Sequence, residues 1–244
     1  MIGAVAIDPG AVKPPPDRLY GRASLHRLRA RQQRLLDVTL PRLAFPPDAA
    51  AQPAQAFSPP VAAVWLEVGF GGGEHAEAFA AAHPDRALIA AEVFLNGVCS
   101  LLSRLVPEGG EADAPLPANL RLWIEDARLL LRALPDRALS GLVLNFPDPW
   151  PKARHAKRRF VHPAMLGELA RVLAPGAEWR VASDDPTYQA WVGAVMGAQD
   201  RFDAPPPSAQ RPAGWAPTRY EAKAIAAGRQ PLYWRFIRRP DRPT

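Results

Sequence analysis

Three glycines at alternate positions, Gly69, Gly71 and Gly73, follow an apolar run that ends at Val68. Glycine lets the chain turn sharply and lets a ligand approach the backbone, so this loop indicates a nucleotide-like ligand. A dinucleotide-binding loop of the form G-x-G-x-x-G needs glycine where this chain has Glu74, whose carboxylate would face the pyrophosphate. The ligand is therefore expected to be something other than NAD. A glycine turn without any ligand is the alternative.

Carboxylates surround the same predicted crevice. Glu67 stands two residues before the first glycine, and Glu92 and Asp126 come at the ends of the next two predicted strands. Carboxylates repel phosphates but suit a ligand with a sulfonium, an ammonium and ribose hydroxyls, which describes S-adenosylmethionine. We expect Glu92 to accept from the ribose, Asp126 to lie near the adenine, and Glu67 to order the loop or meet the amino-acid end. Any one acid could instead interact with a helix dipole, so the prediction depends on all three.

A proline-rich segment, Asn145-Phe146-Pro147-Asp148-Pro149-Trp150, precedes a run of cations. That run covers residues 151–159, reads PKARHAKRR, and contains five Lys or Arg residues and no acid. Contact with the phosphates of a nucleic acid is the expected use, and a solvated charge run is the alternative. Trp150 is expected to be buried and to close the loop rather than to stack on a base.

Alternating apolar and amphipathic stretches must position these residues. Strands are predicted over residues 61–68, 87–92, 120–125, 141–146, 178–183 and 232–238, and helices over residues 74–82, 94–105, 127–133, 163–173 and 188–195. This alternation predicts a mainly parallel sheet with helices on both faces, the doubly wound, Rossmann-like α/β class. Such sheets bind ligands beyond the carboxyl ends of their strands, where the glycines and acids stand.

Length and charge indicate one main domain with a basic appendage. The chain has 244 residues, of which 48% are hydrophobic, and a formal net charge of +6. We predict a flexible tail, an arginine-rich arm and an Ala/Pro-rich linker over residues 1–60, followed by the main domain over residues 61–244. Seven arginines lie between residues 18 and 42, interleaved with leucines. This arm either packs its leucines on the domain, contacts RNA, or does both.

Cysteine content and hydropathy narrow the class of protein further. Cys99 is the single cysteine, so neither an intrachain disulfide nor a Cys-based zinc site is possible, and no metal role is predicted. No uncharged apolar run approaches the roughly 18 residues of a membrane span, and the first residues lack the cationic region of a signal peptide. We expect a cytoplasmic protein without a membrane partner. A monomer and a homodimer are both compatible with the sequence.

Four stretches together resemble the bacterial tRNA (guanine-N7)-methyltransferases: EVGFG from Glu67, FPDPWPKARHAKRR from Phe146, ASD ending at Asp184, and TRYE from Thr218. The resemblance runs from near Leu19 to near Phe236, and the second stretch is far more specific than a glycine pattern. It implies a class I methyltransferase that uses S-adenosylmethionine and modifies the variable-loop guanosine, position 46, of tRNA. The chain departs from the family at Ala91, where glycine is frequent, which affects the backbone path near the ribose.

The resemblance also implies a role for each matching residue. Asp148 is assigned to the catalytic centre. Cofactor contacts are expected from the acids and the glycine loop, namely Glu67, Gly69, Gly71, Glu92, Asp126 and Asp148. The substrate nucleoside is expected to contact Lys152, Asp184, Thr218, Arg219, Tyr220 and Glu221, with Asp184 accepting from the N1 and N2 edge of guanine. RNA is expected to contact Arg154, His155, Lys157, Arg158 and Arg159.

Rival functions explain less of the chain. A nicotinamide-dependent oxidoreductase conflicts with Glu74 and lacks a separate substrate domain. A non-enzymatic RNA-binding protein accounts for the cations but leaves the acid-lined glycine loop without a purpose. Another class I RNA methyltransferase stays open as the nearest alternative. An enzyme for exocyclic amines would be expected to carry Asn or Asp followed by Pro-Pro and an aromatic residue, an order that Phe146 and Asp148 interrupt.

Overall fold

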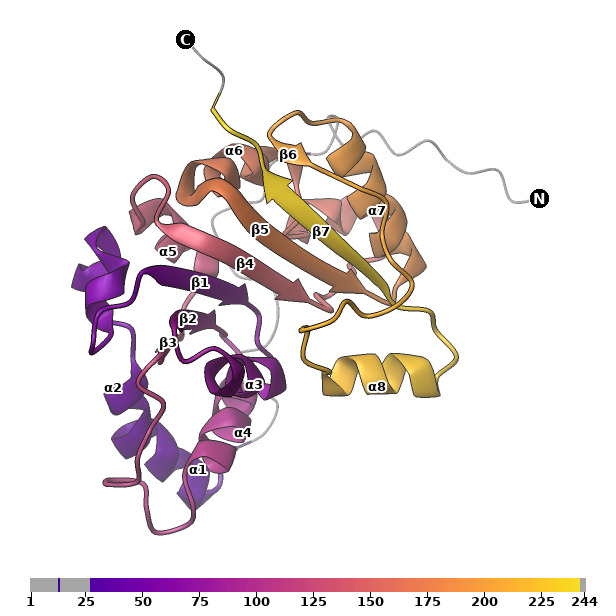
Figure 1. The fold of residues 1–244 in the computed structure, drawn as a ribbon. Helices are drawn as coiled ribbons and strands as arrows, with labels where there is room; N and C mark the ends of the chain where they lie inside the picture. The colour runs from indigo at the N-terminus through magenta and orange to yellow at the C-terminus, as the bar shows by residue number, and fades with distance from the viewer. Residues whose placement is uncertain (1–12, 14–26, 242–244) are drawn as a thin grey trace.

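A computed structural model describes residue 13 and residues 27–241 as one mixed sheet covered by helices (Figure 1). The strands lie in the order β3-β2-β1-β4-β5-β7-β6. Their bounds are Ala63–Val68 (β1), Arg86–Ala91 (β2), Leu120–Trp123 (β3), Leu139–Asn145 (β4), Leu173–Ser183 (β5), Phe202–Asp203 (β6) and Leu232–Arg238 (β7). The first five are parallel, and β7 lies antiparallel between β5 and β6. The predicted doubly wound α/β class is therefore confirmed.

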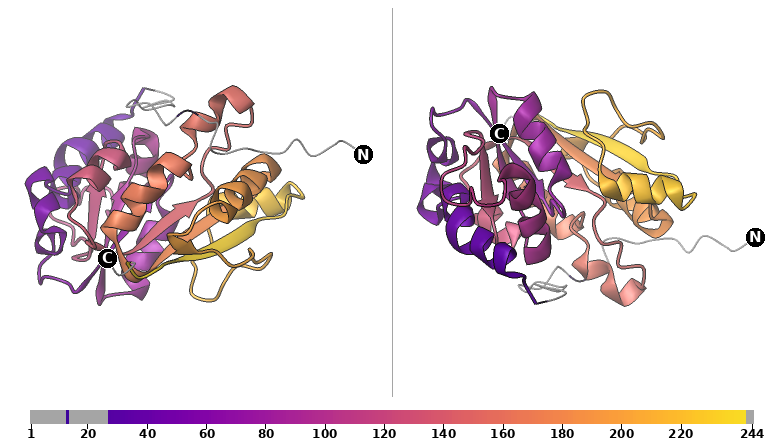
Figure 2. Two further views of the ribbon diagram at one scale, coloured as in Figure 1. Left: turned by 90° about the horizontal axis from the view of Figure 1, so that it is seen from above. Right: turned by 90° about the horizontal axis from the view of Figure 1, so that it is seen from below.

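Helices form a layer on each face of the sheet (Figure 2). Their bounds are Ala30–Arg34 (α1), Leu40–Leu43 (α2), Glu74–Ala82 (α3), Leu95–Leu105 (α4), Ala127–Ala133 (α5), Pro163–Val172 (α6), Pro186–Gly197 (α7) and Arg219–Ala226 (α8). Successive strand residues point to opposite faces, so Trp65 joins the core formed with α3 and α4. Leu66, the next residue, joins the core formed with α5, α6 and α7. Both faces of the central strands are therefore buried, which explains their continuous apolar runs.

The strand order reverses at the boundary between β1 and β4, which are neighbours in the sheet. After β1 the chain builds β2 and β3 on one side, and then returns to build β4 and β5 on the other. The connections that follow β1 and β4 therefore diverge, which opens a crevice beyond the carboxyl ends of these strands. The glycine turn after Val68 and the proline-rich segment after Leu144 both stand at this edge.

The described part of the arginine-rich arm packs on the domain. Leu35 and Leu43 are buried in the same core as α3 and α4. Arg31 and Arg34 both form ion pairs with the buried carboxylate of Glu111. These contacts support the packing interpretation for this stretch, whereas the arm's residues 18–26 lie outside the described part of the chain.

Residues of the predicted Ala/Pro-rich linker also contribute to the core. Short 3-10 helices cover Pro47–Ala51 and Pro53–Ala56, and Ala50 and Phe57 are buried. Phe45 donates its backbone N–H to the carbonyl of Leu122 in β3 at 2.8 Å. The division at residue 60 stays a prediction, but residues 44–57 are packed against the sheet. No helix of the described residues is long and apolar enough to cross a membrane.

Candidate active site

The glycine turn after β1 is tied to the end of β2 through Glu92. Gly69 and Gly71 have φ values of 73° and 57°, in the left-handed region that favours glycine. The N–H of Gly71 donates to Glu92 Oε2 at 2.7 Å, and Glu92 Oε1 accepts from the N–H groups of Val93 and Phe94 at 2.8 and 2.9 Å. Burial raises the pKa of Glu92, although these three bonds oppose the shift. Glu92 therefore holds the backbone of the crevice in addition to lining it.

Glu67 lies beneath this turn rather than in the crevice. Its side chain is almost wholly buried in β1, and its Oε2 lies 3.1 Å from Nδ1 of His75 in α3. The contact has the spacing of an ion pair, but neither atom forms a hydrogen bond of acceptable angle with a described residue. Of the two roles expected for Glu67, this position agrees with ordering the loop.

Asp126 begins α5 at the end of β3. Its carboxylate accepts from the backbone N–H of Arg128 at 3.0 Å and also pairs with the Arg128 guanidinium. Asp126 is therefore an N-terminal cap, and it also lines the crevice beside Glu92 and the exposed Glu125. The structure thus brings Glu92 and Asp126 to one cavity, as expected from their positions at the ends of strands.

The crevice has two lobes that share a wall. The first lobe extends toward α5 and is lined by Ala91, Glu92, Val93, Glu125, Asp126, Ala127, Arg128 and Met165, among others. The second lobe, with a cavity volume of about 480 Å³, extends toward α8 and is lined by Gly71, Phe94, Asn145, Phe146, Pro147, Asp148 and Tyr220. Val68, Gly69, Glu92, Val93, Trp150, Arg158 and Phe160 line both. Small-molecule sites usually measure roughly 300–1,000 Å³, so this crevice has room for a nucleoside-sized ligand.

The proline-rich segment forms one side of the second lobe. Asp148 is exposed at the lobe, and Trp150 is half-buried and lines both lobes, so it is less enclosed than expected. The guanidinium of Arg158 lies over the Trp150 ring, 4.6 Å from its centroid, and the His155 ring meets the indole edge-on at 5.9 Å. Lys152 and Arg154, which follow this segment in the chain, are exposed. Partial desolvation and then the surrounding cations, Arg158 first among them, lower the pKa of His155.

Arg159 differs from the other cations of its run. It is 4% exposed, and its Nε and Nη2 donate to the carbonyl oxygens of Pro149 and Trp150 at 3.1 and 2.9 Å. Its guanidinium also lies 4.8 Å from the centroid of the Trp191 ring. The expected RNA contact of Arg159 is therefore not what this geometry provides, because the donors are turned inward onto the loop.

The TRYE stretch begins helix α8 with a capping box. Thr218 Oγ1 accepts from the N–H of Glu221 at 3.1 Å, and Glu221 accepts in turn from the N–H of Thr218 at 3.4 Å. The buried Glu221 carboxylate also accepts from Arg211 at 2.8 and 2.9 Å and from the Tyr233 hydroxyl at 2.5 Å. Thr218 and Glu221 therefore fix α8 on β7 and on the loop before it.

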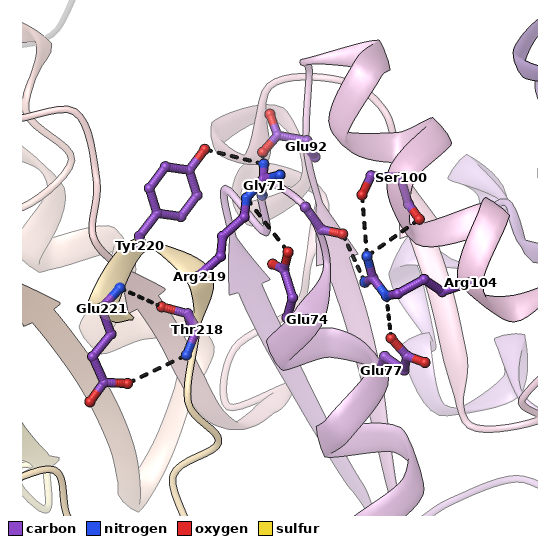
Figure 3. A network of polar contacts seen from close by, with 11 residues as sticks. Gly71, Glu74, Glu77, Glu92, Ser100, Arg104, Thr218, Arg219, Tyr220 and Glu221 are labelled. Carbon is purple, nitrogen blue, oxygen red and sulfur yellow. Dashed lines mark hydrogen bonds and ion pairs between the residues drawn. The ribbon is translucent and has the colours of Figure 1, made fainter. Parts of the chain in front are cut away.

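The two middle residues of this stretch reach the glycine turn (Figure 3). Arg219 Nε lies 3.5 Å from Oε1 of Glu74, the first residue of α3. Tyr220 is 41% exposed and lines the second lobe, so close to Gly71 that a β-carbon on this glycine would lie 2.9 Å from the tyrosine ring. Asp184 lies apart from both lobes and pairs with Arg229 at 2.5 Å. The structure thus brings Tyr220 to the crevice but does not bring Asp184 into contact with it.

Comparison with known proteins assigns this arrangement to a family. Residues 61–233 match a family model described as a putative methyltransferase. A tRNA (guanine-N(7)-)-methyltransferase of Granulibacter bethesdensis is 64% identical over 93% of this chain and 98% of its own length. Its counterpart in Rhodospirillum rubrum is 48% identical over 93% of this chain and 91% of its own length. The chain belongs to the family of bacterial tRNA (guanine-N(7)-)-methyltransferases.

Among solved structures, a 16S rRNA methyltransferase, KamB, is similar in fold to this methyltransferase. The TM-score is 0.50, with 18% sequence identity, and the match covers 74% of this chain and 89% of KamB. This likeness supports the class I methyltransferase fold and carries no information on substrate.

Several residues of the methyltransferase crevice were not anticipated as site residues from the sequence. Val93, Phe94, Trp150 and Phe160 supply its apolar walls. Val93 and Phe94 follow Glu92 directly, so their position after a strand was the available signal. Trp150 and Phe160 flank the basic run. The charge of this run predicts phosphate contacts and gives no signal for the apolar residues at its ends.

Proposed function

We propose that this methyltransferase transfers the methyl group of S-adenosylmethionine to N7 of a guanine in tRNA, the variable-loop guanosine at position 46, in the cytoplasm. The observation that carries the proposal is the two-lobed crevice. Glu92, Glu125 and Asp126 line its first lobe together with three arginines, of which Arg128 pairs with Asp126. Asp148 lies in the second lobe, and the exposed cations Lys152 and Arg154 follow it in the chain. One lobe suits a cationic nucleoside cofactor, and the other adjoins a surface suited to phosphates.

The first lobe has the features that S-adenosylmethionine requires. A β-carbon on Gly69 would meet no atom within 4 Å, so the turn leaves open space where a ligand can lie against the backbone. Glu92 and Asp126 stand where ribose hydroxyls and the adenine can be bound, and Val93 and Met165 offer apolar surface. When bound, this cofactor supplies an electrophilic methyl group on a sulfonium. No cluster of His, Cys, Asp and Glu suited to a metal occurs among the described residues.

The chemistry of guanine N7 demands mainly positioning. N7 carries an in-plane lone pair and no hydrogen, so no general base is needed before the methyl group is transferred, and orientation of the reactants dominates. Positive charge moves onto the purine during transfer, and the carboxylate of Asp148 is placed at the second lobe to stabilise it. We assign Asp148 the catalytic role on this basis.

The remaining residues divide between the nucleoside and the RNA backbone. Tyr220 offers a ring to the purine at the second lobe, and Arg219 beside it adds a cation. Thr218 and Glu221 support them from within α8. Asp184 serves the guanine edge only if its pair with Arg229 opens, which would free both partners for the substrate. Lys152, Arg154, His155, Lys157 and Arg158 are proposed to contact the phosphates.

Methyl transfer to unmodified tRNA tests the proposal. The protein is incubated with labelled S-adenosylmethionine and tRNA, and the product is cleaved chemically at N7-methylguanosine to locate the modification. The expected result is one cleavage in the variable loop. Asp148→Ala should abolish transfer while tRNA affinity is retained, whereas Arg154→Ala should weaken tRNA binding with a shallower salt dependence. Absence of label from tRNA, or label at an exocyclic amine, would overturn the N7 assignment.

A further inference from the structure

We infer that Arg159 is a positioning residue for methyl transfer, which acts by holding the backbone of the loop that carries Asp148 and Trp150. This inference rests on the proposed function for the role of that loop. It separates Arg159 from the other cations of the basic run, whose side chains are at least partly exposed.

The loop from Phe146 to Trp150 has little means of holding its own shape. Phe146 and Trp150, at its two ends, adopt φ values of 49° and 45°, a left-handed conformation that costs about 1–2 kcal/mol for residues other than glycine. Pro147 and Pro149 have no N–H group to donate. A conformation of this kind persists only where the surrounding structure supports it.

Arg159 provides support at the Trp150 end of this loop. Its two nitrogens donate to consecutive carbonyls, those of Pro149 and Trp150, in the forked geometry that only a guanidinium offers. The donor side chain is 4% exposed and its acceptors are half-buried, so loss of these bonds would leave polar groups poorly solvated. The bond to the Trp150 carbonyl falls on the residue with φ of 45°, and therefore stabilises the left-handed turn directly.

The guanidinium is itself anchored in the domain core. It lies on the face of Trp191, a residue of α7 that is 1% exposed and donates from its indole nitrogen to the carbonyl of Val161 at 2.6 Å. Among the described residues, no carboxylate lies within ion-pair distance of Arg159, and burial lowers its pKa. Asp185 and Tyr188 oppose this lowering of the pKa from a longer range, and the side chain also lines the first lobe, but its two hydrogen bonds both go to the loop that carries Asp148.

Substitution by lysine distinguishes positioning from RNA contact. Arg159→Lys keeps the charge but loses the fork and the planar stack, so we expect kcat to fall about tenfold or more with the KM for tRNA changed less than about threefold. If Arg159 contacted RNA instead, Arg159→Lys would leave kcat near the wild-type value and would affect only the KM for tRNA, because lysine also binds phosphate as a point charge. Arg154→Ala is the matched exposed substitution in the same run, and should act mainly on the KM for tRNA.

Chemical rescue supplies a readout that a general loss of structure would not produce. For Arg159→Ala we expect a loss of about 100-fold in kcat, since displacement of a catalytic group by about 1 Å has an effect of this size. Added methylguanidinium should raise the kcat of Arg159→Ala at least tenfold, whereas methylammonium should not. If Arg159→Ala does not fold, as judged by circular dichroism, Arg159→Lys carries the test. Wild-type kcat in Arg159→Lys, or a raised KM for tRNA alone, overturns the inference. An inactive wild-type enzyme would instead contradict the proposed function.

Discussion

The backbone N–H of Gly71 donates to Oε2 of Glu92 at 2.7 Å, which joins the turn after β1 to the end of β2. The other oxygen of Glu92 accepts from Val93 and Phe94, so one carboxylate organises two loops at the crevice. We therefore expect cofactor binding and stability to be linked at Glu92. Glu92, for which its position at the end of a strand predicts a ligand contact, also holds the backbone of these two loops.

Glu92→Gln should reduce both stability and cofactor affinity. Glutamine has one acceptor oxygen, so its amide NH₂ group must face a backbone N–H on one side. At least one of these half-buried N–H groups then loses its partner. We expect a loss of about 1–3 kcal/mol in the free energy of unfolding and a weaker affinity for S-adenosylmethionine. Denaturant unfolding and titration calorimetry measure these quantities. Glu125→Gln, at an exposed acid of the same lobe, should leave the unfolding midpoint unchanged. An unchanged midpoint in Glu92→Gln would contradict this account.

Affinity for tRNA should rise as the pH falls from 7 toward 5.5. Partial desolvation, and then Arg158, Arg154 and Lys152, lower the pKa of His155 below its ordinary value, so in the free protein this imidazole is less protonated than an ordinary histidine at the same pH. Bound phosphates would offset those cations and raise its pKa, so binding takes up a proton and is favoured at lower pH. The expected gain is about threefold, measured by filter binding at constant salt. His155→Gln should remove this pH dependence, and persistence of the same slope in the variant would exclude His155 as its source.

The ring of Tyr220 should matter more than its hydroxyl. The side chain lies over Gly71 at the second lobe, and a stacked base is worth about 1–3 kcal/mol. Tyr220→Ala should therefore reduce kcat/KM for tRNA by roughly 10- to 100-fold, whereas Tyr220→Phe should stay within about threefold of the wild type. Ile225→Ala, at an exposed residue of the same helix, serves as the control. A comparable loss in Tyr220→Phe would indicate hydrogen bonding in place of stacking.

Most of the fold could be predicted because the central strands are buried on both faces. Their apolar runs are continuous, and α3, α5 and β7 have the bounds expected from the sequence. The two-residue strand β6 has no periodic pattern of its own and exists through its pairing with β7. Helix α8 is not among the predicted helices, although Thr218 and Glu221 form the S/T-x-x-E pattern of a capping box, because the family resemblance assigns both residues to the substrate.

The candidate site was predicted less completely than the fold. Acids at the ends of strands, such as Glu92 and Asp126, were recognised because parallel strands bring their carboxyl ends to one edge. A run of cations does not reveal which member is buried, so the sequence predicts the same RNA contact for the buried Arg159 as for the more exposed cations beside it. Its role depends on Trp191, which is distant in sequence and is brought to it by the packing of α7.

A pair of glycine substitutions should shift stability in opposite directions. Gly141 in β4 faces Trp65, and a β-carbon there would lie 2.5 Å from the indole ring, so Gly141→Ala overpacks the core. A loss of about 1–3 kcal/mol is expected. Gly193, in α7, is exposed and has no atom within 4 Å of an added β-carbon. Gly193→Ala should gain about 0.5–1 kcal/mol through helix propensity and reduced freedom of the unfolded chain. Scanning calorimetry should show midpoints displaced by about 2–4 °C per kcal/mol on opposite sides of the wild type. A raised midpoint in Gly141→Ala would contradict overpacking against Trp65, and a lowered midpoint in Gly193→Ala would contradict the argument from helix propensity.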